Sequence, residues 1–287
     1  MKFLVLGANG MAGHMISLYL SENGHDVTGF ARSKSPFVKT VVGDAKDTSL
    51  LKGTISNGNF DTVINSIGLL NQFAEANKAD AVFLNGFLPH FLAEVTSGTP
   101  TQVIHMSTDC VFSGRKGQYT EADLPDGETF YDRSKAMGEL NDSKNLTLRN
   151  SIIGPDIKPS GIGLLNWFMQ QSGPSVNGFT GAVWTGQTTL QLAKTMEAAA
   201  KERVTGLINA IPSSSITKFK LLKLFNKYFR NNQLTINPVK GISADKSLVR
   251  TNTKWDYQIP DYDRMISELA DWMKSHRSLY PHYSTLA

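Results

Sequence analysis

Tyr131 and Lys135 are the first two side chains whose types and spacing could carry out chemistry. They stand four residues apart in Tyr131-Asp132-Arg133-Ser134-Lys135, and residues four apart share a face of a helix. An ammonium group beside a phenol favours the phenolate and lowers the phenol pKa. The Tyr131 hydroxyl would then be a proton donor or acceptor near neutral pH. The same spacing also arises by chance on solvated helices, so its meaning depends on the elements around it.

Hydroxyl groups follow an apolar segment, residues 103–106, that we expect to be a strand. Thr108 is placed at its carboxyl end to hydrogen-bond a substrate carbonyl oxygen as that oxygen becomes an alkoxide. Ser107 is the alternative residue for this role. Either hydroxyl would otherwise be a turn or capping group, and the neighbouring Tyr-Lys pair favours catalysis for Thr108.

Three glycines, Gly7, Gly10 and Gly13, stand three residues apart near the start of the chain. They follow an expected strand over residues 3–6 and open an expected helix over residues 11–21. A turn of this kind brings backbone N–H groups to a pyrophosphate at the positive end of a helix. We therefore predict a dinucleotide site here, in preference to a purely structural turn. Its contacts are predicted to be Gly7, Asn9, Gly10, Met11 and Gly13.

The end of the second expected strand, residues 26–30, decides which dinucleotide is favoured. An Asp or Glu there would bind the ribose 2′-hydroxyl of NAD, but the chain continues without an acid to Arg32 and Ser33. These two residues could receive a 2′-phosphate, although they could also form an exposed basic loop. NADPH is the predicted cofactor, with NADH as the second candidate.

Other cofactor contacts follow from the rule that ligands lie at the carboxyl ends of parallel strands. The residues after the third strand are expected to face the adenine, and those after the fourth to line the nicotinamide side. Asn85, in the expected helix over residues 74–97, is also predicted to contact the cofactor. These predicted contacts are Asp44, Ala45, Ser66, Ile67, Gly68 and Asn85.

Strands alternate with helices through the first 110 residues, which indicates an α/β fold with a doubly wound parallel sheet of the Rossmann type. Residues 1–150 are predicted to form a dinucleotide-binding domain, and residues 151–287 mainly a smaller, interleaved substrate-binding domain. Returns to the sheet are expected near residues 182–212. The expected strands are 3–6, 26–30, 40–42, 62–67, 103–106, 146–148 and 207–211. The expected helices are 11–21, 50–56, 74–97 with a break near Pro89, 130–142, 164–171, 189–201, 218–229 and 265–274.

The composition favours a cytoplasmic enzyme. The chain has 287 residues with a formal net charge of +4, and its only cysteine is Cys110, which fits a reducing compartment. No clustered basic pattern indicates nucleic-acid binding, and no apolar run is long enough to cross a membrane. His14, His105 and His282 have no metal-ligand spacing, so no metal site is predicted.

Taken together, these motifs resemble the extended short-chain dehydrogenase/reductase superfamily, and within it the dTDP-4-dehydrorhamnose reductase-like branch. The matching motifs are Gly7-x-x-Gly10-x-x-Gly13, Ser107-Thr108-Asp109-x-Val111-Phe112-x-Gly114, and Tyr131-x-x-x-Lys135 with Gly138-Glu139. The resemblance implies a catalytic triad of Thr108, Tyr131 and Lys135, with Lys135 also holding the nicotinamide ribose and Asp109 near the sugar. The chain departs from the family at Cys110, where an aromatic residue is usual, and at Asp132, where glycine is usual.

The resemblance implies NADPH-dependent reduction of the 4-keto group of a dTDP- or UDP-linked 4-keto-6-deoxy sugar, in deoxysugar or surface polysaccharide synthesis. Dehydratases of the superfamily have Glu where this chain has Cys110, which disfavours dehydration. A nucleotide-sugar epimerase and a non-catalytic NADP-binding regulatory subunit are the alternatives. Related enzymes often dimerise, so a homodimer is left open.

The second half is expected to bind the nucleotide sugar. Trp184 lies in a glycine-rich loop and is preferred over Trp167, which is expected to be core. Arg149 would line the site or contact a pyrophosphate, unless it forms a buried ion pair. Lys246 and Arg250 could reach a diphosphate. The predicted substrate contacts are Ser107, Asp109, Arg149, Trp184 and Gln187.

Overall fold

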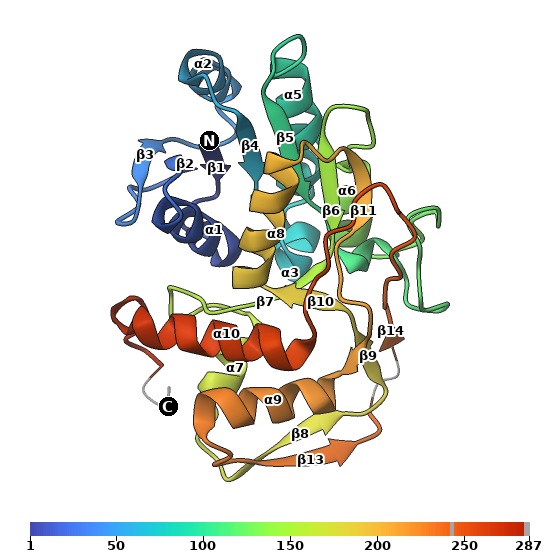
Figure 1. Ribbon diagram of the computed structural model, residues 1–287. Coiled ribbons are helices and arrows are strands. Elements are labelled where there is room, and N and C mark those ends of the chain that lie inside the picture. Colours follow the sequence, from blue (N-terminus) through green and yellow to red (C-terminus); the bar gives the residue numbers. More distant parts are fainter. Residues whose placement is uncertain (242–243, 284–287) are drawn as a thin grey trace.

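The computed structural model describes residues 1–241 and 244–283, and a seven-stranded sheet forms its centre (Figure 1). The strand order is β11-β6-β5-β4-β1-β2-β3, and neighbouring strands are parallel. The predicted doubly wound parallel sheet is therefore confirmed. Its strands are β1 (Lys2–Leu6), β2 (Asp26–Ala31), β3 (Lys39–Val42), β4 (Thr62–Asn65), β5 (Gln102–Met106), β6 (Leu146–Arg149) and β11 (Gly206–Asn209).

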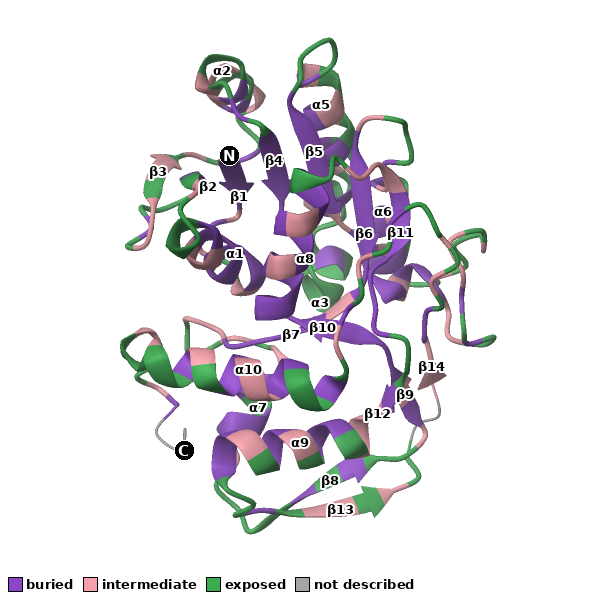
Figure 2. Ribbon diagram, viewed as in Figure 1, coloured by how far each residue is buried: buried purple, intermediate pink, exposed green. Residues whose placement is uncertain are grey.

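Helices cover both faces of this sheet because successive residues of a strand point to opposite faces. In β1, Phe3 and Val5 join the core under α1 and α8, whereas Leu4 and Leu6 join the core under α2 and α5. The central strands are buried along their length (Figure 2). The helices of this part are α1 (Met11–Glu22), α2 (Thr48–Gly58), α3 (Asn71–Ala76), α4 (Lys78–Ala81), α5 (Leu88–Val95), α6 (Phe130–Met137) and α8 (Thr189–Lys201).

Two expected helices differ from the prediction. The helix predicted over residues 74–97 is divided into α3, α4, a π-helical segment (Val82–Phe87) and α5. The helix predicted to reach residue 142 is α6, and it ends at Met137. A Cβ on Gly138 would lie only 1.9 Å from the carbonyl oxygen of Asn85, so α6 ends where its backbone packs closely on the π-helical segment.

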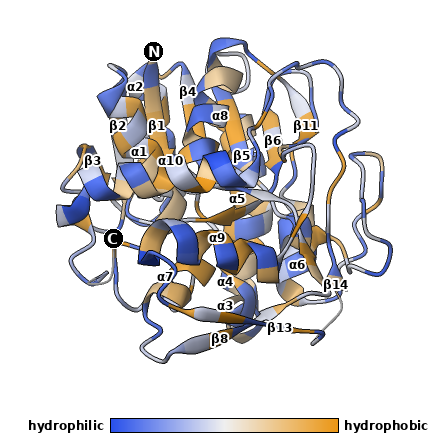
Figure 3. Ribbon diagram, turned by 60° about the horizontal axis from the view of Figure 1, so that its bottom comes forward, coloured by the Kyte–Doolittle hydropathy of each residue, from blue (hydrophilic) through white to orange (hydrophobic). Residues whose placement is uncertain are grey.

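The second half of the chain supplies both a separate group of elements and two returns to the main sheet. Strand β11 pairs with β6, and α8 packs on α1, where the Tyr19 hydroxyl donates to Glu197 at 2.8 Å. Hydrophobic and hydrophilic residues alternate along α9 and α10 (Figure 3), whose apolar residues join the core beneath the sheet. The remaining elements are β7 (Ser151–Ile153), α7 (Leu164–Met169), β8 (Ser175–Phe179), β9 (Ala182–Trp184), β10 (Gly186–Thr188), β12 (Ile216–Thr217), α9 (Lys218–Arg230), β13 (Thr235–Val239), β14 (Ala244–Asp245) and α10 (Tyr262–Ser275).

No helix within the described residues is both long enough and apolar enough to span a bilayer.

Candidate active site

The glycine turn between β1 and α1 has a conformation that larger residues would not adopt. Gly7 has φ +81°, a region that favours glycine. A Cβ on Gly13 would lie 2.0 Å from the Gly7 carbonyl oxygen, so the third glycine allows the helix to approach the strand. The Gly10 N–H donates to the Gly7 carbonyl at 2.8 Å, and α1 begins at the next residue.

A cleft of about 840 Å³ opens beside this turn, at the carboxyl ends of β1, β2 and β4. The structure thus brings most of the predicted cofactor contacts together around one cavity. The turn supplies a cradle that side chains would fill, which fits a dinucleotide pyrophosphate. The predicted contacts that line the cleft are Gly7, Asn9, Gly10, Met11, Arg32, Ser33, Asp44, Ala45, Ser66, Ile67 and Gly68.

Arg32 and Ser33 lie at the rim of this cleft, after β2, and both are exposed. The Asn9 side-chain amide donates to the Ser33 carbonyl at 2.9 Å and to its hydroxyl at 3.2 Å. These contacts tie the rim to the glycine turn. The guanidinium and the hydroxyl are therefore offered to a ligand on the same side of the cleft as the turn.

A loop that sequence reasoning did not assign also lines the cleft. It runs from Asp156 to Ile162, and Lys158 of this loop is one of the lining residues. The Asp156 N–H donates to the Tyr283 hydroxyl at 2.9 Å, which anchors the loop to the C-terminal segment. Gly154, Pro155 and Gly161 are residue types common in loops, but they carry no information about which surface the loop lines.

Asn85, a predicted cofactor contact, lies just behind Gly68 of the cleft, and its side chain is engaged by protein groups. Its amide donates to the Leu69 carbonyl and to the Ser134 hydroxyl, each at 3.0 Å, and accepts from the Leu69 N–H at 2.8 Å. Protein groups thus occupy both ends of the buried amide. Asn85 fixes the segment after β4 against α6.

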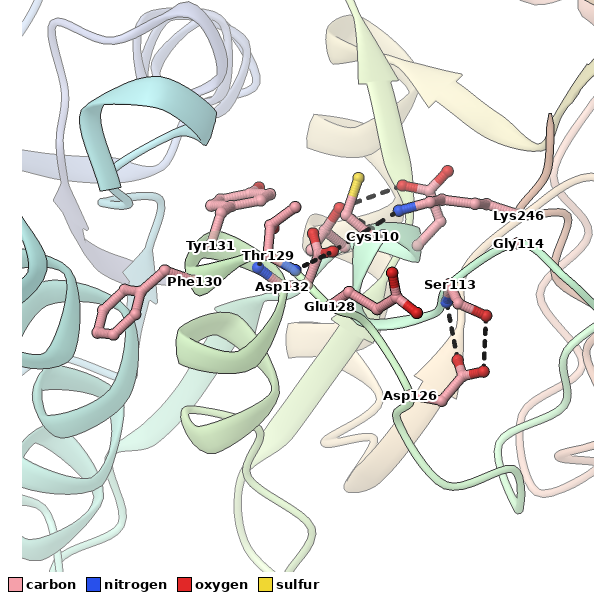
Figure 4. Close-up of polar contacts among 12 residues, drawn as sticks. Cys110, Ser113, Gly114, Asp126, Glu128, Thr129, Phe130, Tyr131, Asp132 and Lys246 are labelled. Carbon is pink, nitrogen blue, oxygen red and sulfur yellow. Dashed lines mark hydrogen bonds and ion pairs between the residues drawn. The ribbon is translucent and has the colours of Figure 1, made fainter. Parts of the chain in front are cut away.

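Tyr131 and Lys135 lie one turn apart on α6, as the spacing requires. The helix begins with a capping box in which Asp132 N–H donates to Thr129 Oγ1 at 3.1 Å and Thr129 N–H donates to Asp132 Oδ2 at 3.2 Å. Figure 4 shows Tyr131 and Asp132 at this helix start, with Cys110 beside them. The cap fixes where the first turn of α6 begins.

The pKa of Tyr131 is raised, whereas the sequence predicted that it is lowered. The main cause is burial, reinforced by the thiol of Cys110 and the carboxylate of Asp109, and only the hydrogen bond with Thr108 opposes them. Tyr131 packs in a cluster with Ala74 of α3. The prediction was wrong because it considered the neighbouring lysine and not the cover over the phenol.

The Lys135 ammonium nitrogen points to β5 and not to the phenol. It lies 2.6 Å from the Met106 carbonyl oxygen and 3.4 Å from His105 Nε2. Lys135 is buried, and this burial lowers its pKa to about 8 against the opposing charge of Glu139. Gly68 lines the cleft, and a Cβ added to it would lie 4.0 Å from Lys135 Nζ. The Lys135 side chain therefore ends close to the cavity.

The two hydroxyls after β5 have different partners. Thr108 Oγ1 accepts from the Cys110 N–H at 3.1 Å and donates to Asp109 Oδ1 at 3.1 Å. Ser107 Oγ donates to Glu139 Oε1 at 2.6 Å. Ser107, a predicted substrate contact, is therefore engaged by the buried Glu139 carboxylate, and Thr108 is the hydroxyl beside Tyr131.

A carboxylate and a cation also lie near Thr108, those of Asp109 and Lys246. Burial raises the pKa of Asp109 and raises the pKa of the Cys110 thiol to about 12, so this thiol is not activated. Lys246, from the segment after β14, approaches Asp132 with Nζ 4.0 Å from Oδ2 (Figure 4). The second half of the chain thus adds a positive charge next to the predicted catalytic residues.

Three predicted substrate contacts are instead internal. Arg149 forms a buried ion pair with Glu139, with Nε–Oε1 and Nη2–Oε2 distances of 2.7 Å. Gln187 donates to the Ala210 carbonyl and accepts from the Thr195 hydroxyl. Trp184 is buried against the ring of Tyr262, at 5.6 Å between centroids. Other residues of the protein thus engage all three side chains in this structure. Trp167 is 42% exposed, which contradicts its expected place in the core.

A second cleft, of about 630 Å³, lies between the segment after β11 and the segment before α10. It is lined by a run of hydroxyls, Ser213, Ser214 and Ser215, and by Arg250. The Arg250 guanidinium also donates to the Tyr257 carbonyl at 2.7 Å. The sequence analysis named Arg250 as a candidate diphosphate contact. It did not name the three consecutive serines, which are the sequence feature that could have indicated this cleft.

Within residues 1–241 and 244–283, no group of three or more His, Cys, Asp or Glu side chains could hold a metal ion.

Comparison with known proteins places these features in a family. The family model described as RmlD substrate binding domain matches residues 1–151. The probable low-salt glycan biosynthesis reductase Agl14 of Haloferax volcanii is 35% identical over 143 residues, covering 48% of each chain. A dTDP-4-dehydrorhamnose reductase of Streptomyces griseus is 29% identical over 140 residues, covering 48% of this chain and 43% of that protein. The aligned part spans about half the length of these curated relatives.

Solved structures show the same fold over nearly the whole chain. A hypothetical dTDP-4-dehydrorhamnose reductase from Sulfolobus tokodaii has a TM-score of 0.76 at 24% identity, covering 92% of this chain and 98% of that one. The dTDP-4-dehydrorhamnose reductase of Bacillus anthracis, in complex with NADP, has a TM-score of 0.79 at 18% identity, covering 93% and 98%. With the family model matched from the glycine turn to the end of β6, the chain belongs to the RmlD substrate binding domain family.

Proposed function

We propose that this chain is an NADPH-dependent oxidoreductase that reduces the 4-keto group of a nucleotide-linked 4-keto-6-deoxy sugar. The observation that carries the proposal is the position of Tyr131 and Lys135 on one face of α6, beside Thr108. Lys135 lies near Gly68, which lines the cleft of the glycine turn. The names of relatives, which include glycan biosynthesis and dTDP-4-dehydrorhamnose reductases, support a place in glycan synthesis. A cytoplasmic location is part of the proposal.

The residues of the large cleft would hold the cofactor. Backbone N–H groups of the glycine turn would bind the pyrophosphate, and Arg32 with Ser33 would bind a 2′-phosphate. NADPH, when bound, supplies the hydride for the reduction. NADPH is expected in preference to NADH because the residues that directly follow β2 at the rim of the cleft are Arg32 and Ser33, and neither carries a carboxylate.

Tyr131 would donate a proton to the C4 oxygen of the sugar. Its raised pKa keeps the phenol protonated, which is the form that a proton donor needs. Thr108, which lies near enough to Tyr131 to oppose the rise of its pKa, would hold the same oxygen as negative charge develops on it. Lys135 would orient the ribose, and Asp109 with Lys246 would stand on the sugar side.

The activity is tested by following NADPH oxidation with dTDP- and UDP-linked 4-keto-6-deoxyhexoses. We expect turnover with at least one of them, and a loss of about 100-fold or more in kcat for Tyr131→Phe. Tyr228→Phe is the matched control, because the Tyr228 hydroxyl donates to Asp263 on the surface, far from the cleft. No turnover with any of these sugars, or full activity in Tyr131→Phe, would overturn the proposal.

The cofactor preference is tested separately by binding. Arg32→Ala is expected to raise the Kd for NADPH by about tenfold, which corresponds to about 1.4 kcal/mol, and to leave the Kd for NADH unchanged. Lys34→Ala removes the same charge two residues away, from an exposed position outside the cleft lining. Equal effects of the two variants would show general charge attraction and contradict a specific 2′-phosphate contact.

A further inference from the structure

A buried chain of hydrogen bonds joins β4 to the Lys135 side chain. The Ile67 N–H donates to Asn65 Oδ1 at 3.1 Å, and Asn65 Nδ2 lies 3.2 Å from His105 Nδ1. His105 Nε2 lies 3.4 Å from Lys135 Nζ, which lies 2.6 Å from the Met106 carbonyl oxygen. The side chains of Asn65, His105 and Lys135 are all buried.

The Ile67 N–H sets the direction of donation along this series of hydrogen bonds. A backbone N–H is only a donor, so the Asn65 atom that faces Ile67 must be the oxygen. The Asn65 amide nitrogen therefore faces His105 and donates to Nδ1. A neutral imidazole that accepts at Nδ1 carries its proton on Nε2, so His105 presents an N–H to Lys135.

An ammonium group does not suit this position. The Lys135 ammonium has three donors and no lone pair, so at His105 two donors would face each other. A neutral amine accepts from His105 Nε2–H and still donates to the Met106 carbonyl. The neutral form of Lys135 therefore satisfies every hydrogen bond in the chain.

The groups around Lys135 shift its pKa in both directions. Burial lowers its pKa to about 8, whereas the carboxylate of Glu139, one turn further along α6, raises it. That carboxylate is held by Arg149 and Ser107, which reduces its effect on Lys135. On the other side, the raised pKa of Tyr131 keeps the phenol neutral.

The groups around His105 keep the imidazole neutral. Burial is the main cause, and it lowers the pKa of His105 well below the usual value. An uncharged His105 is the condition that the tautomer argument requires. The same side chain therefore stays an N–H donor through the neutral pH range.

We propose that Asn65 and His105 are positioning residues that shift the Lys135 side chain of the free protein toward its neutral amine form. We further propose that binding of an anionic dinucleotide transfers one proton from the buffer to this amine. The second part rests on the proposed function. Gly68 lines the cleft beside Lys135, so a negatively charged ligand there favours the ammonium form.

The first part is tested on the wild-type protein without a ligand, by ¹⁵N NMR of its histidines. We expect a protonated Nε2 and an unprotonated Nδ1 for His105 across neutral pH. The Lys135 side chain, assigned by its loss in Lys135→Met, is expected to titrate at or below about 8. A proton on Nδ1, or a Lys135 midpoint at the ordinary lysine value, would overturn the inference.

Two variants test the direction of the chain. Asn65→Asp replaces the donor to Nδ1 with an acceptor, so the proton is expected to move to Nδ1 and the Lys135 midpoint to rise by about one pH unit or more. His105→Gln can turn its carbonyl to Lys135 and is expected to raise the midpoint in the same direction. His25→Gln is the matched control, since His25 pairs with Glu197 at 2.8 Å on another part of the fold. Unchanged midpoints in both variants would contradict the proposal.

The second part is tested by calorimetry of NADP⁺ binding in two buffers with different heats of ionisation. At a pH above the Lys135 midpoint, we expect uptake of about one proton per site, and almost none in Asn65→Asp. Binding of NADP⁺ without proton uptake would refute the coupling and leave the proposed function intact. Absence of any NADP⁺ binding would refute the proposed function, while the histidine tautomer would still decide the first part.

Discussion

At the scale of single residues, burial decides what the charged groups of this protein do. Arg149 has the charge and the position expected of a substrate contact, at the end of β6, but its guanidinium is bound to Glu139 and stacks 4.9 Å from the Phe112 ring centroid. Ser107 completes this cluster through the same carboxylate. The pair holds the end of α6 against β6, so it supports the site without facing it.

Removing one member of this ion pair should be costly. Arg149→Met leaves the Glu139 carboxylate buried without its partner, and we expect a loss of about 3–5 kcal/mol in the free energy of unfolding. Arg115→Met breaks the exposed pair with Glu128, and should cost no more than about 1 kcal/mol. Urea denaturation measures both values. Equal losses would show that the Arg149 pair is not the buried structural contact described here.

At the scale of elements, the sequence predicted what is encoded by local patterns. The β-α alternation and the glycine turn depend on residues close together in the chain, and the sheet and the turn follow them. The four-residue spacing of Tyr131 and Lys135 likewise required only that α6 be a helix. Arg32 and Ser33 reach the cleft because they directly follow β2.

What the sequence did not predict depends on contacts between distant segments. Gln187 is satisfied by Ala210 and Thr195, which no local pattern indicates. The direction of the Tyr131 pKa shift depends on the cover supplied by α3 and Cys110. For the same reason, the sequence did not predict that the loop over residues 156–162 lines the cleft.

The glycine turn gives the sharpest prediction at this scale. Gly13→Ala would place a Cβ 2.0 Å from the Gly7 carbonyl oxygen and 2.9 Å from Ser66 Oγ, so β1 and α1 must move apart. We expect a loss of about 1–3 kcal/mol in the free energy of unfolding and a Kd for NADP⁺ at least tenfold higher. Denaturation and fluorescence titration measure the two effects.

The matched control for that variant is Gly53→Ala in α2, where an added Cβ meets nothing within 4 Å. Alanine there should stabilise the helix by about 0.5–1 kcal/mol and leave the Kd for NADP⁺ unchanged. If the two alanine variants lowered stability or binding alike, close packing at Gly13 would not be the cause.

At the scale of the whole molecule, residues 280–283 contact both the helix after the glycine turn and a loop that lines the cofactor cleft. His14 of α1 bonds to the Gly10 carbonyl through Nδ1, at 2.9 Å, and to the Tyr280 hydroxyl through Nε2, at 2.8 Å. Tyr283, three residues later, accepts from the Asp156 N–H in the loop over the cleft. The segment 280–283 thus connects the glycine turn to a loop that also lines the cleft.

This connection predicts a pH dependence of global stability. Burial lowers the pKa of His14 from 6.5 to about 4, so between these values the unfolded chain binds more protons than the folded protein. The stability due to neutral His14 is complete above pH 6.5 and is lost as the pH falls towards 4, by about 3 kcal/mol in all. His14→Gln should be less stable at neutral pH because it loses the imidazole contacts, but its profile should be flatter over this range. Tyr280→Phe, which keeps the buried imidazole and removes one partner, should retain the wild-type slope. Urea denaturation at several pH values measures the three profiles, and parallel profiles for wild type and His14→Gln would contradict the assignment of this slope to His14.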